Sequence, residues 1–385
     1  MNKPGETFAE LGVSSFFTSR LAERRIGTPT EIQRLVIPRL FAGENALFRS
    51  ATGTGKTFAY LLPFFQGLLQ SGTETGPQLL ILAPTLELCS QIKGEADFLL
   101  KPLDSGAGLI IGSANINRQI QTLKKEKPKV IVGNPARLIQ LERMGKLKLN
   151  RIRGLVLDEG DRLIADELLE DTLSLVRRVN QSRQTAACSA TMSPRSRERL
   201  LPLLGGSAAV LETAAQEILR ERISHWALFS EGRRKIRTLC SFLAAVRAKK
   251  TLVFTGRAGE VGNIVSQLQY HKVSSAGLHG DLDKRVRKQS LDDFRSGRCR
   301  VLVASDLGAR GLDFADINYV IALDVPADSE AYIHRAGRTA RAGKQGVMVT
   351  IGDEEELRRF ACLEKKLGII VYPKILHQGQ VCSPQ

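Results

Sequence analysis

The sequence predicts an α/β fold of two tandem domains, each a mostly parallel sheet flanked by helices. Short apolar runs rich in β-branched residues alternate with helical patterns along the chain, which is typical of a parallel sheet with crossover helices. The 385 residues also exceed what one hydrophobic core usually supports. The hydrophobic fraction of 43% is that of an ordinary folded protein and excludes a largely disordered chain.

The apolar runs give the expected strands and the expected domain boundary. We expect strands at 46–48, 79–83, 130–132, 155–157 and 185–188 in the first half, and at 251–254, 301–304, 319–322 and 346–351 in the second. The pattern is interrupted between Gly205 and Ala215, after the last strand-like run of the first half. We therefore expect domains at 1–212 and 213–372, with a short tail at 373–385.

The charge of the chain favours a polyanionic partner. The net charge is +16, and each phosphate that a Lys or Arg neutralises releases counterions. Aromatic residues make up only 5%, so few rings can stack on bases, and contacts should fall on the sugar-phosphate backbone. Charge alone leaves RNA, DNA and acidic proteins open as partners.

Cysteine use and hydropathy indicate a cytoplasmic protein without membrane contact. The six cysteines include no Cys-x-x-Cys pair, which argues against a zinc site and a disulfide framework. The apolar stretch 58–69 is interrupted by Pro63 and Gln66 and is too short to span a bilayer. The first six residues contain no apolar core of a signal peptide.

Residues 50–57 read Ser-Ala-Thr-Gly-Thr-Gly-Lys-Thr and predict a phosphate-binding loop. They follow an expected strand and lead into a helical pattern, so backbone N–H groups and a helix N-terminus would meet the phosphates. Lys56 would reach the β- and γ-phosphates, and the Thr57 hydroxyl would bind Mg²⁺. The strict pattern has Gly where Ser50 stands. The alternative, a flexible Gly-Thr turn, is disfavoured by the flanking strand and helix.

Asp158 and Glu159 end an apolar strand and are the expected catalytic acids. The carboxyl edge of a sheet is where an α/β fold holds its ligands. Asp158 would hold Mg²⁺ through water, and Glu159 would orient or deprotonate the attacking water. Two acids after a strand are by themselves more often a helix start, but the phosphate-binding loop favours the catalytic interpretation.

The second half contains no Gly-Lys-Thr or Gly-Lys-Ser but is rich in arginine at 332–341. On a helix, His334, Arg338 and Arg341 would share one face. Gly337 inside that helix would cost about 1 kcal/mol relative to Ala, which suggests a close approach to another group. Arginines brought to a γ-phosphate from a second domain would act as arginine fingers. The alternative is a solvated basic face.

These motifs, in this order from Phe8 to about Ile351, resemble the core of DEAD-box RNA helicases of superfamily 2. The resemblance implies two RecA-like domains, ATP and Mg²⁺ as cofactors, and RNA as a partner bound with little sequence specificity. It further implies RNA-stimulated ATP hydrolysis with local, non-processive duplex unwinding or RNP remodelling by a monomeric core. An ATP-gated RNA clamp with little unwinding remains the main alternative. A pseudoenzyme scaffold and a DNA helicase are disfavoured.

The resemblance also implies three sets of site residues. The residues expected at the nucleotide are Phe8, Gln33, Thr52, Gly53, Thr54, Gly55, Lys56, Thr57 and Asp313, with Gln33 at the adenine and Asp313 at the ribose. The residues expected in catalysis are Lys56, Asp158, Glu159, Arg338 and Arg341, with Thr57 and Asp158 at the metal. The residues expected to bind RNA or couple it to ATP are Pro84, Thr85, Gly112, Pro135, Arg137, Ser189, Thr191, Arg257, His279, Gly280, Ser305, Arg310 and His334.

Several positions depart from the family pattern. Gly160 stands where the family has Ala, Leu86 where it has Arg, and Ala136 where it has Gly. Further departures are Ile26, Asn134 and Lys284. Most of them fall on the implied RNA path, which predicts a diverged grip on RNA beside an intact ATP site. The alternative for Leu86 is that it packs apolar surface while other basic residues contact the phosphate.

Overall fold

The chain folds into two compact units, 1–213 and 214–385. The computed structural model describes residues 6–51, 53–70, 76–103, 106–213, 215–280, 282–306, 308–309, 314, 316–326, 328–340 and 344–384. The division falls one residue after the boundary expected from the sequence. Among these described residues, no helix is long and apolar enough to cross a membrane.

In the described part of the first unit, seven parallel strands form one sheet in the order β3-β4-β2-β5-β6-β1-β7. The strands are β1 (Asn45–Arg49), β2 (Leu79–Leu82), β3 (Ala107–Ile110), β4 (Val130–Gly133), β5 (Gly154–Asp158), β6 (Gln184–Ser189) and β7 (Ala208–Glu212). Every residue of β2, β4 and β5 is buried, as expected for parallel strands covered on both faces.

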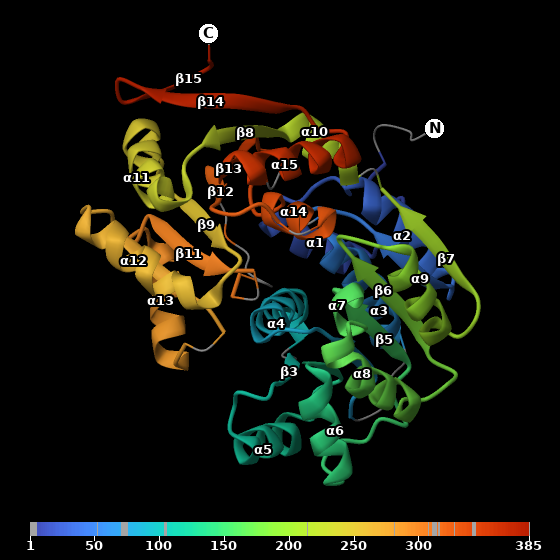
Figure 1. Cartoon of the computed structure of the whole chain (residues 1–385). Coiled ribbons are helices and arrows are strands. Elements are labelled where there is room, and N and C mark those ends of the chain that lie inside the picture. Colours follow the sequence, from blue (N-terminus) through green and yellow to red (C-terminus); the bar gives the residue numbers. More distant parts are fainter. Residues whose placement is uncertain are drawn as a thin grey trace. The chain divides into compact units, whose positions relative to one another are not determined.

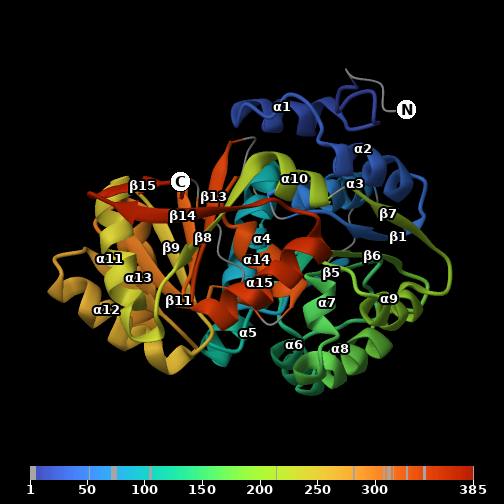
Figure 2. The same cartoon turned by 45° about the horizontal axis from the view of Figure 1, so that its top comes forward.

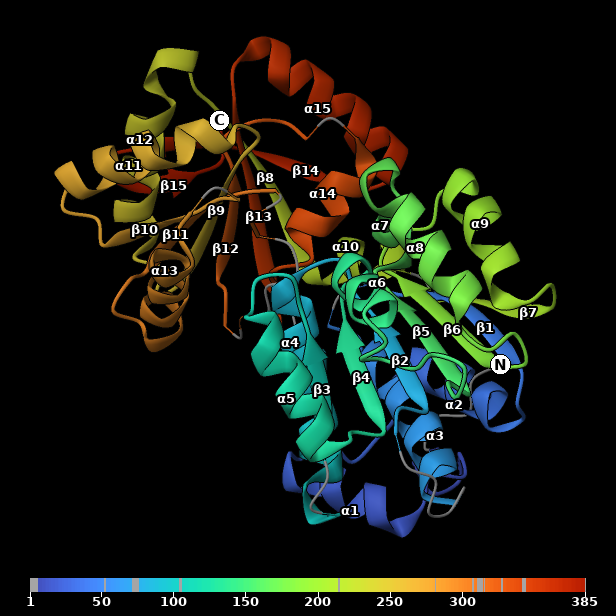
Figure 3. The same cartoon turned by 90° about the horizontal axis from the view of Figure 1, so that it is seen from below.

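Helices cover both faces of this sheet, as Figure 3 shows. The α-helices are α1 (Ser15–Glu23), α2 (Glu31–Phe41), α3 (Lys56–Gln70), α4 (Leu86–Leu100), α5 (Ile116–Glu126), α6 (Pro135–Arg143), α7 (Gly160–Leu163), α8 (Asp166–Arg178) and α9 (Pro194–Leu200), and the 3₁₀ helices are η1 (Lys101–Leu103) and η2 (Leu201–Leu204). One apolar cluster joins α1–α4 to the sheet, and a second joins α5–α9 to its other face.

The described part of the second unit contains an eight-stranded sheet in the order β10-β11-β9-β12-β13-β8-β14-β15. Its strands are β8 (Ile223–Phe229), β9 (Thr251–Thr255), β10 (Ser275–Leu278), β11 (Val301–Ser305), β12 (Tyr319–Ala322), β13 (Gly346–Gly352), β14 (Val371–His377) and β15 (Gln380–Cys382). All pairs are parallel except β14–β15, which is antiparallel.

Helices flank this second sheet on both sides as well, with α11 and α12 opposite α14 and α15 (Figure 2). The α-helices are α10 (Ala215–Arg222), α11 (Lys235–Val246), α12 (Val261–Tyr270), α13 (Lys284–Ser296), α14 (Ser329–Ala336) and α15 (Glu354–Leu367), and the 3₁₀ helices are η3 (Gly232–Arg234) and η4 (Ala258–Glu260). The predicted fold class, two tandem mostly parallel sheets flanked by helices, is confirmed.

All nine expected strands are present, but the described residues contain six further strands that were not predicted, and the expectation of a separate tail at 373–385 was wrong. The segment after Tyr372 is no appendage, because β14 pairs with β8 along the sheet and β15 pairs with β14 (Figure 1). The other missed strands are β3, β7, β8 and β10. Four-residue strands such as β3 and β10 contain Gly and Ala, which have little strand preference of their own.

Candidate functional site

The predicted phosphate-binding loop lies between β1 and α3, at the carboxyl end of a strand in the first sheet. Gly53 and Gly55 have φ angles of +78° and +87°, a backbone region that favours glycine. A Cβ atom on Gly55 would also lie 2.4 Å from Gln33 Nε2. The shape of the loop therefore requires these two glycines.

Lys56 opens α3, and its ammonium group lies against the loop. Nζ donates to the backbone oxygens of Ser50 at 2.7 Å and Ala51 at 2.8 Å. Burial lowers the pKa of Lys56, and the negative charge of Asp158 nearby opposes that shift. Thr57 follows at the second position of the helix and is half-buried. Phosphate oxygens could replace the two carbonyls as acceptors, and the contact of Lys56 with phosphates stays a prediction.

Ser50, which departs from the strict motif, has a structural role of its own. Its φ is not positive, so this position does not require glycine. Its hydroxyl accepts a hydrogen bond from Thr213 Oγ1 at 2.8 Å and lies 2.8 Å from Thr54 Oγ1. Its backbone N–H donates to the Ser189 carbonyl at 3.1 Å. Hydrogen bonds of Ser50 therefore connect the loop to Thr213, which follows β7, and to the end of β6.

Gln33 connects the start of α2 to the phosphate-binding loop. Its Nε2 donates to the Gly55 carbonyl at 3.0 Å, and its Oε1 accepts from Thr30 N–H at 2.8 Å as part of a capping box. In this conformation the amide oxygen is already used, so a contact with adenine stays a prediction. Phe8 is 3% exposed within the apolar cluster of this face and offers a base little ring surface.

Asp158 ends β5 as a buried carboxylate with three hydrogen-bond donors. Tyr60 Oη donates to Oδ2 at 2.8 Å, Cys188 Sγ donates to Oδ1 at 3.2 Å, and Glu159 N–H donates to Oδ1 at 2.9 Å. Burial raises the pKa of the Tyr60 hydroxyl, and the Asp158 charge raises it further. The two side-chain donors come from α3 and β6, so three elements fix the orientation of this carboxylate. No sequence motif points to either donor.

Glu159 adopts a left-handed backbone conformation, with φ of 49° and ψ of 50°. Non-glycine residues in this region are uncommon and are concentrated at functional sites. The turn ends β5 and begins α7. The backbone geometry supports the special role that the sequence predicts for this residue.

A hydrogen bond links the acidic motif to the predicted coupling motif. Thr191 Oγ1 donates to Asp161 Oδ2 at 2.7 Å, and both side chains are buried. Thr191 N–H also donates to Ser189 Oγ at 3.2 Å. The end of β6 is therefore linked to α7 within a few residues of Asp158 and Glu159.

The RNA candidates of the first unit follow the carboxyl ends of β2, β3 and β4, the same edge as the phosphate-binding loop. Thr85, which follows Pro84, is the N-cap of α4 and accepts from Leu88 N–H at 3.3 Å. Arg137 donates to the backbone oxygens of Gly112 at 2.6 Å and Ala114 at 3.0 Å. Pro135, at the start of α6, is buried. The structure thus brings these candidates together along one edge.

Two departures from the family pattern are explained by packing. Leu86 is partly buried against the apolar cluster beneath α4, which supports the alternative that it covers apolar surface. A Cβ atom on Gly160 would lie 3.3 Å from both Leu200 Cδ atoms, so α9 lies closer to α7 than an alanine would comfortably allow. Leu200 itself is fully buried.

The arginine-rich motif of the second unit differs from the prediction. Helix α14 ends at Ala336 and Gly337 is its C-cap, so Arg338 follows the helix and shares no helical face with His334. The reasoning from a glycine inside the helix was therefore wrong, because Gly337 ends the helix instead. Arg338 is 7% exposed, and its Nε donates to the His334 carbonyl at 3.3 Å.

Arg335, which no motif singled out, forms ion pairs with two aspartates of the second unit. Its side chain is 2% exposed and forms a bidentate ion pair with Asp306, through two hydrogen bonds of 2.6 Å and 2.7 Å. It forms a second ion pair with Asp324 at 2.7 Å. These bonds join α14 to the loops after β11 and β12. Arg335 lies on the buried face of α14 together with Tyr332 and Ala336, whereas the prediction used the face of His334.

The other candidates of the second unit follow its strands. Ser305 ends β11 and accepts from Gly308 N–H at 3.1 Å, His279 and Gly280 follow β10, and Arg257 follows β9. Arg257 is exposed and pairs with Glu260 at 3.1 Å. The predicted site residues Thr52, Arg310, Asp313 and Arg341 lie outside the described residues, as does the side chain of Lys284.

The chain is similar to known proteins over almost all of its length. Residues 30–200 match the DEAD/DEAH box helicase family, and residues 234–343 match the helicase conserved C-terminal domain. The chain is 33% identical to the DEAD-box ATP-dependent RNA helicase CshC of Bacillus cereus, over 91% of this chain and 88% of that protein. It is also 33% identical to the ATP-dependent rRNA helicase RRP3 of Encephalitozoon cuniculi, over 94% and 90%. Among solved structures, S. cerevisiae Dbp5 bound to RNA and ADP BeF3 superposes with a TM-score of 0.86 at 26% identity, over 96% of each chain.

Proposed function

The chain belongs to the DEAD-box family of ATP-dependent RNA helicases, and we propose that it couples ATP hydrolysis to local, non-processive unwinding of RNA or remodelling of RNA–protein complexes. Members of this family are RNA-dependent ATPases, and this chain is one of them. The observation that carries the proposal is the Asp158 carboxylate, buried and held by three donors beside the lysine of the phosphate-binding loop.

The donor set fits Mg²⁺, the metal that ATP hydrolysis in this family requires. Mg²⁺ prefers oxygen ligands and keeps several waters. Thr57 offers a hydroxyl and Asp158 a carboxylate whose orientation is fixed, so these two residues would hold the ion. A bound Mg²⁺ would neutralise the charge that develops on the β- and γ-phosphate oxygens.

Different residues of the first unit would have different roles in ATP hydrolysis. Lys56 would bind the phosphates with the ammonium group that donates to two backbone carbonyls in this structure. Glu159, whose backbone is left-handed, would orient the attacking water and accept its proton. Arg338 and Arg341 stay predictions as arginine fingers.

The Thr191–Asp161 bond supports coupling between hydrolysis and RNA. Both groups are buried, and Asp161 lies two residues from Glu159, so a shift of the acidic motif would be transmitted to the end of β6. Such a bond has two discrete states, made and broken, which is what coupling between two sites requires.

The test is Glu159→Gln in the full chain, with Lys56→Ala beside it. Glu159→Gln keeps the size of the side chain but cannot accept a proton, so we expect ATP and RNA to bind while hydrolysis falls by about 10²-fold or more. Lys56→Ala should instead lose ATP binding. Nucleotide affinity is measured with a fluorescent ATP analogue and turnover by phosphate release. Wild-type turnover in Glu159→Gln would refute the assignment.

The alternative, an ATP-gated clamp, rests on the departures along the RNA edge. Unwinding of a short RNA duplex, followed together with RNA-stimulated ATP hydrolysis, separates the two. A motor shows both activities, whereas a clamp hydrolyses ATP and holds RNA without separating the strands. Hydrolysis that poly-DNA stimulates as well as poly-RNA would refute RNA as the specific partner.

A further inference from the structure

Two segments of the first unit concentrate positive charge. Residues 124–129 and 142–153 contain nine Lys and Arg and two Glu, so these 18 residues supply a net charge of +7 in a chain of +16. The basic residues are Lys124, Lys125, Lys127, Lys129, Arg143, Lys146, Lys148, Arg151 and Arg153, which we call the amino-edge surface. All are exposed except Lys129, which is half-buried. Leu147, Leu149 and Ile152 alternate with them and are buried, so packing turns the charges outward.

Backbone hydrogen bonds place the last residue of each segment, Lys129 and Arg153, at one edge of the sheet. Gln78 N–H donates to the Lys129 carbonyl at 2.8 Å, and Arg153 N–H donates to the Gln78 carbonyl at 2.7 Å. Gln184 N–H then donates to the Arg153 carbonyl at 2.8 Å. The four residues form a row across the amino ends of β4, β2, β5 and β6. Neighbouring strands lie about 4.8 Å apart, so Lys129 and Arg153 are about 10 Å apart along the edge.

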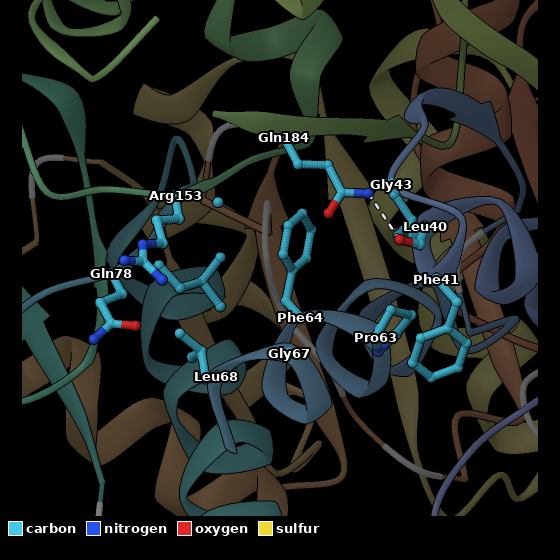
Figure 4. Close-up of a pocket in the computed structure, with 12 residues that line it drawn as sticks. Leu40, Phe41, Gly43, Pro63, Phe64, Gly67, Leu68, Gln78, Arg153 and Gln184 are labelled. Atoms are coloured by element: carbon cyan, nitrogen blue, oxygen red, sulfur yellow. Dashed lines mark hydrogen bonds between the residues drawn. The ribbon is translucent and has the colours of Figure 1, made fainter. Parts of the chain in front are cut away.

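A pocket of about 300 Å³ opens on the same row (Figure 4). Its walls include Phe64, Pro63 and Leu68 of α3, and Arg153 and Gln184 line it from the strand ends. This volume is at the lower limit for small-molecule sites, so the pocket suits one ring system rather than a whole nucleotide.

Gln184 gives the pocket a fixed hydrogen-bond acceptor. Its Nε2 donates to the backbone oxygens of Leu40 at 2.8 Å and Glu44 at 2.9 Å, which determines the orientation of the amide. The amide oxygen therefore points away from these carbonyls, toward Phe64 in Figure 4. A flat ring with N–H groups on its edge complements apolar walls and one acceptor.

Gly67 leaves additional room at this pocket. It lies inside α3 and lines the pocket, and a Cβ atom there would meet nothing within 4 Å. A glycine inside a helix costs about 1 kcal/mol relative to alanine. Neither a positive φ nor a close neighbour requires this glycine.

The amino-edge surface is separate from the ATP site. The phosphate-binding loop, Asp158 and the RNA candidates of this unit all lie at the carboxyl ends of the strands. The five residues of β5 separate the two edges by about 16 Å. None of the described first-unit residues implied to bind RNA lies on this amino edge.

We propose that the amino-edge surface and its pocket form a second RNA-binding surface, which takes the phosphates of a single strand on its basic residues and one unpaired base in the pocket. The inference rests on RNA as the ligand of the chain and adds a second segment of RNA to the one at the ATP edge. Exposed lysines and arginines attract phosphates, and the apolar pocket with one acceptor accepts a base. An acidic protein would match the charge but gives no reason for the pocket.

The test compares RNA of two lengths in the full chain with a non-hydrolysable ATP analogue. An oligonucleotide of about ten nucleotides fills one single-strand site, whereas one about four times longer can reach both edges. The first variant combines Lys146→Gln and Lys148→Gln, since neither lysine forms an ion pair within the described part of the chain. The control combines Arg359→Gln and Lys366→Gln, two exposed residues of α15 whose loss removes the same charge.

We expect the lysine variant to bind the long RNA with a salt slope lower by about 1.4, because each phosphate contact of a single strand contributes about 0.7. Binding of the short RNA and the ATP hydrolysis that it stimulates should stay unchanged. The control variant should bind both RNA lengths as the wild type does. Gly67→Leu places a side chain at the pocket, should keep or slightly raise the melting temperature, and should weaken binding of only the long RNA.

Two results would overturn the proposal. An unchanged salt slope for the long RNA would show that the lysines contact no phosphate, which is also the result expected if the surface binds an acidic protein. An equal loss of affinity for both RNA lengths would show that the two lysines act on the RNA bound at the carboxyl edge, beside the ATP site. The proposed function fails by a different result, a wild-type chain whose ATP hydrolysis the short RNA does not stimulate.

Discussion

Tyr60→Phe tests whether the orientation of Asp158 governs Mg²⁺-dependent nucleotide binding. The substitution removes one oxygen and leaves the buried ring in place, since Tyr60 is fully buried. It deletes the 2.8 Å donation to Asp158 Oδ2, while the donations from Cys188 and Glu159 to Oδ1 remain. The carboxylate is then held at one oxygen only.

The magnitude follows from the kind of bond that is lost. A hydrogen bond to a charged group contributes about 1.5–3 kcal/mol. If the free carboxylate oxygen rotates away from its metal-binding orientation, nucleotide affinity in the presence of Mg²⁺ should fall by about tenfold or more, because tenfold corresponds to about 1.4 kcal/mol. Without Mg²⁺ the affinity should change little. The melting temperature of the first unit should fall by about 3–12 °C, at about 2–4 °C per kcal/mol for a domain of this size.

The assay is titration of a fluorescent ATP analogue with and without Mg²⁺, together with thermal unfolding. The matched control is Tyr332→Phe, which removes an equally buried hydroxyl that lies 2.7 Å from His225 Nδ1 in the second unit. This control should lose stability but keep Mg²⁺-dependent affinity. Wild-type affinity with Mg²⁺ in Tyr60→Phe would refute the reasoning, because Asp158 would then need no donor on Oδ2.

Three further predictions concern other contacts. Gln33→Ala removes the bonds to Thr30 and Gly55, so we expect weaker ATP binding and a smaller preference for ATP over GTP; equal kcat/KM for both nucleotides in the wild type would remove the case for adenine recognition. Arg335→Ala strands two carboxylates and should destabilise the second unit by about 3–5 kcal/mol in denaturant unfolding, whereas a loss below about 1 kcal/mol would show that solvent replaces the ion pairs. Gly160→Ala should change stability by less than about 1 kcal/mol, because helix preference offsets the contact with Leu200; a larger loss would show that α9 cannot shift.

The phosphate-binding loop could be predicted because its residues are contiguous. Gly53, Gly55 and Lys56 lie within one turn between a strand and a helix, and their spacing follows from the shape of a phosphate-binding loop. The end of the helix at 329–336 was harder to predict, because the arginine motif continues beyond Gly337 whereas the helix ends there. Glycine near a helix end can be interior or a C-cap, and the sequence favoured the interior position incorrectly.

Sequence patterns determined the fold class, nine of the described strands and the position of the phosphate-binding loop between a strand and a helix, because each of these depends on neighbours along the chain. Only the tertiary structure decided which distant side chains meet. Tyr60 reaches Asp158 across 98 residues, and Thr213 reaches Ser50 across 163. Such contacts depend on strand order, here β5-β6-β1-β7, which follows from the burial of whole faces and not from any local pattern. The same order aligns Lys129, Arg153 and Gln184 on one edge and creates a surface that no single segment encodes.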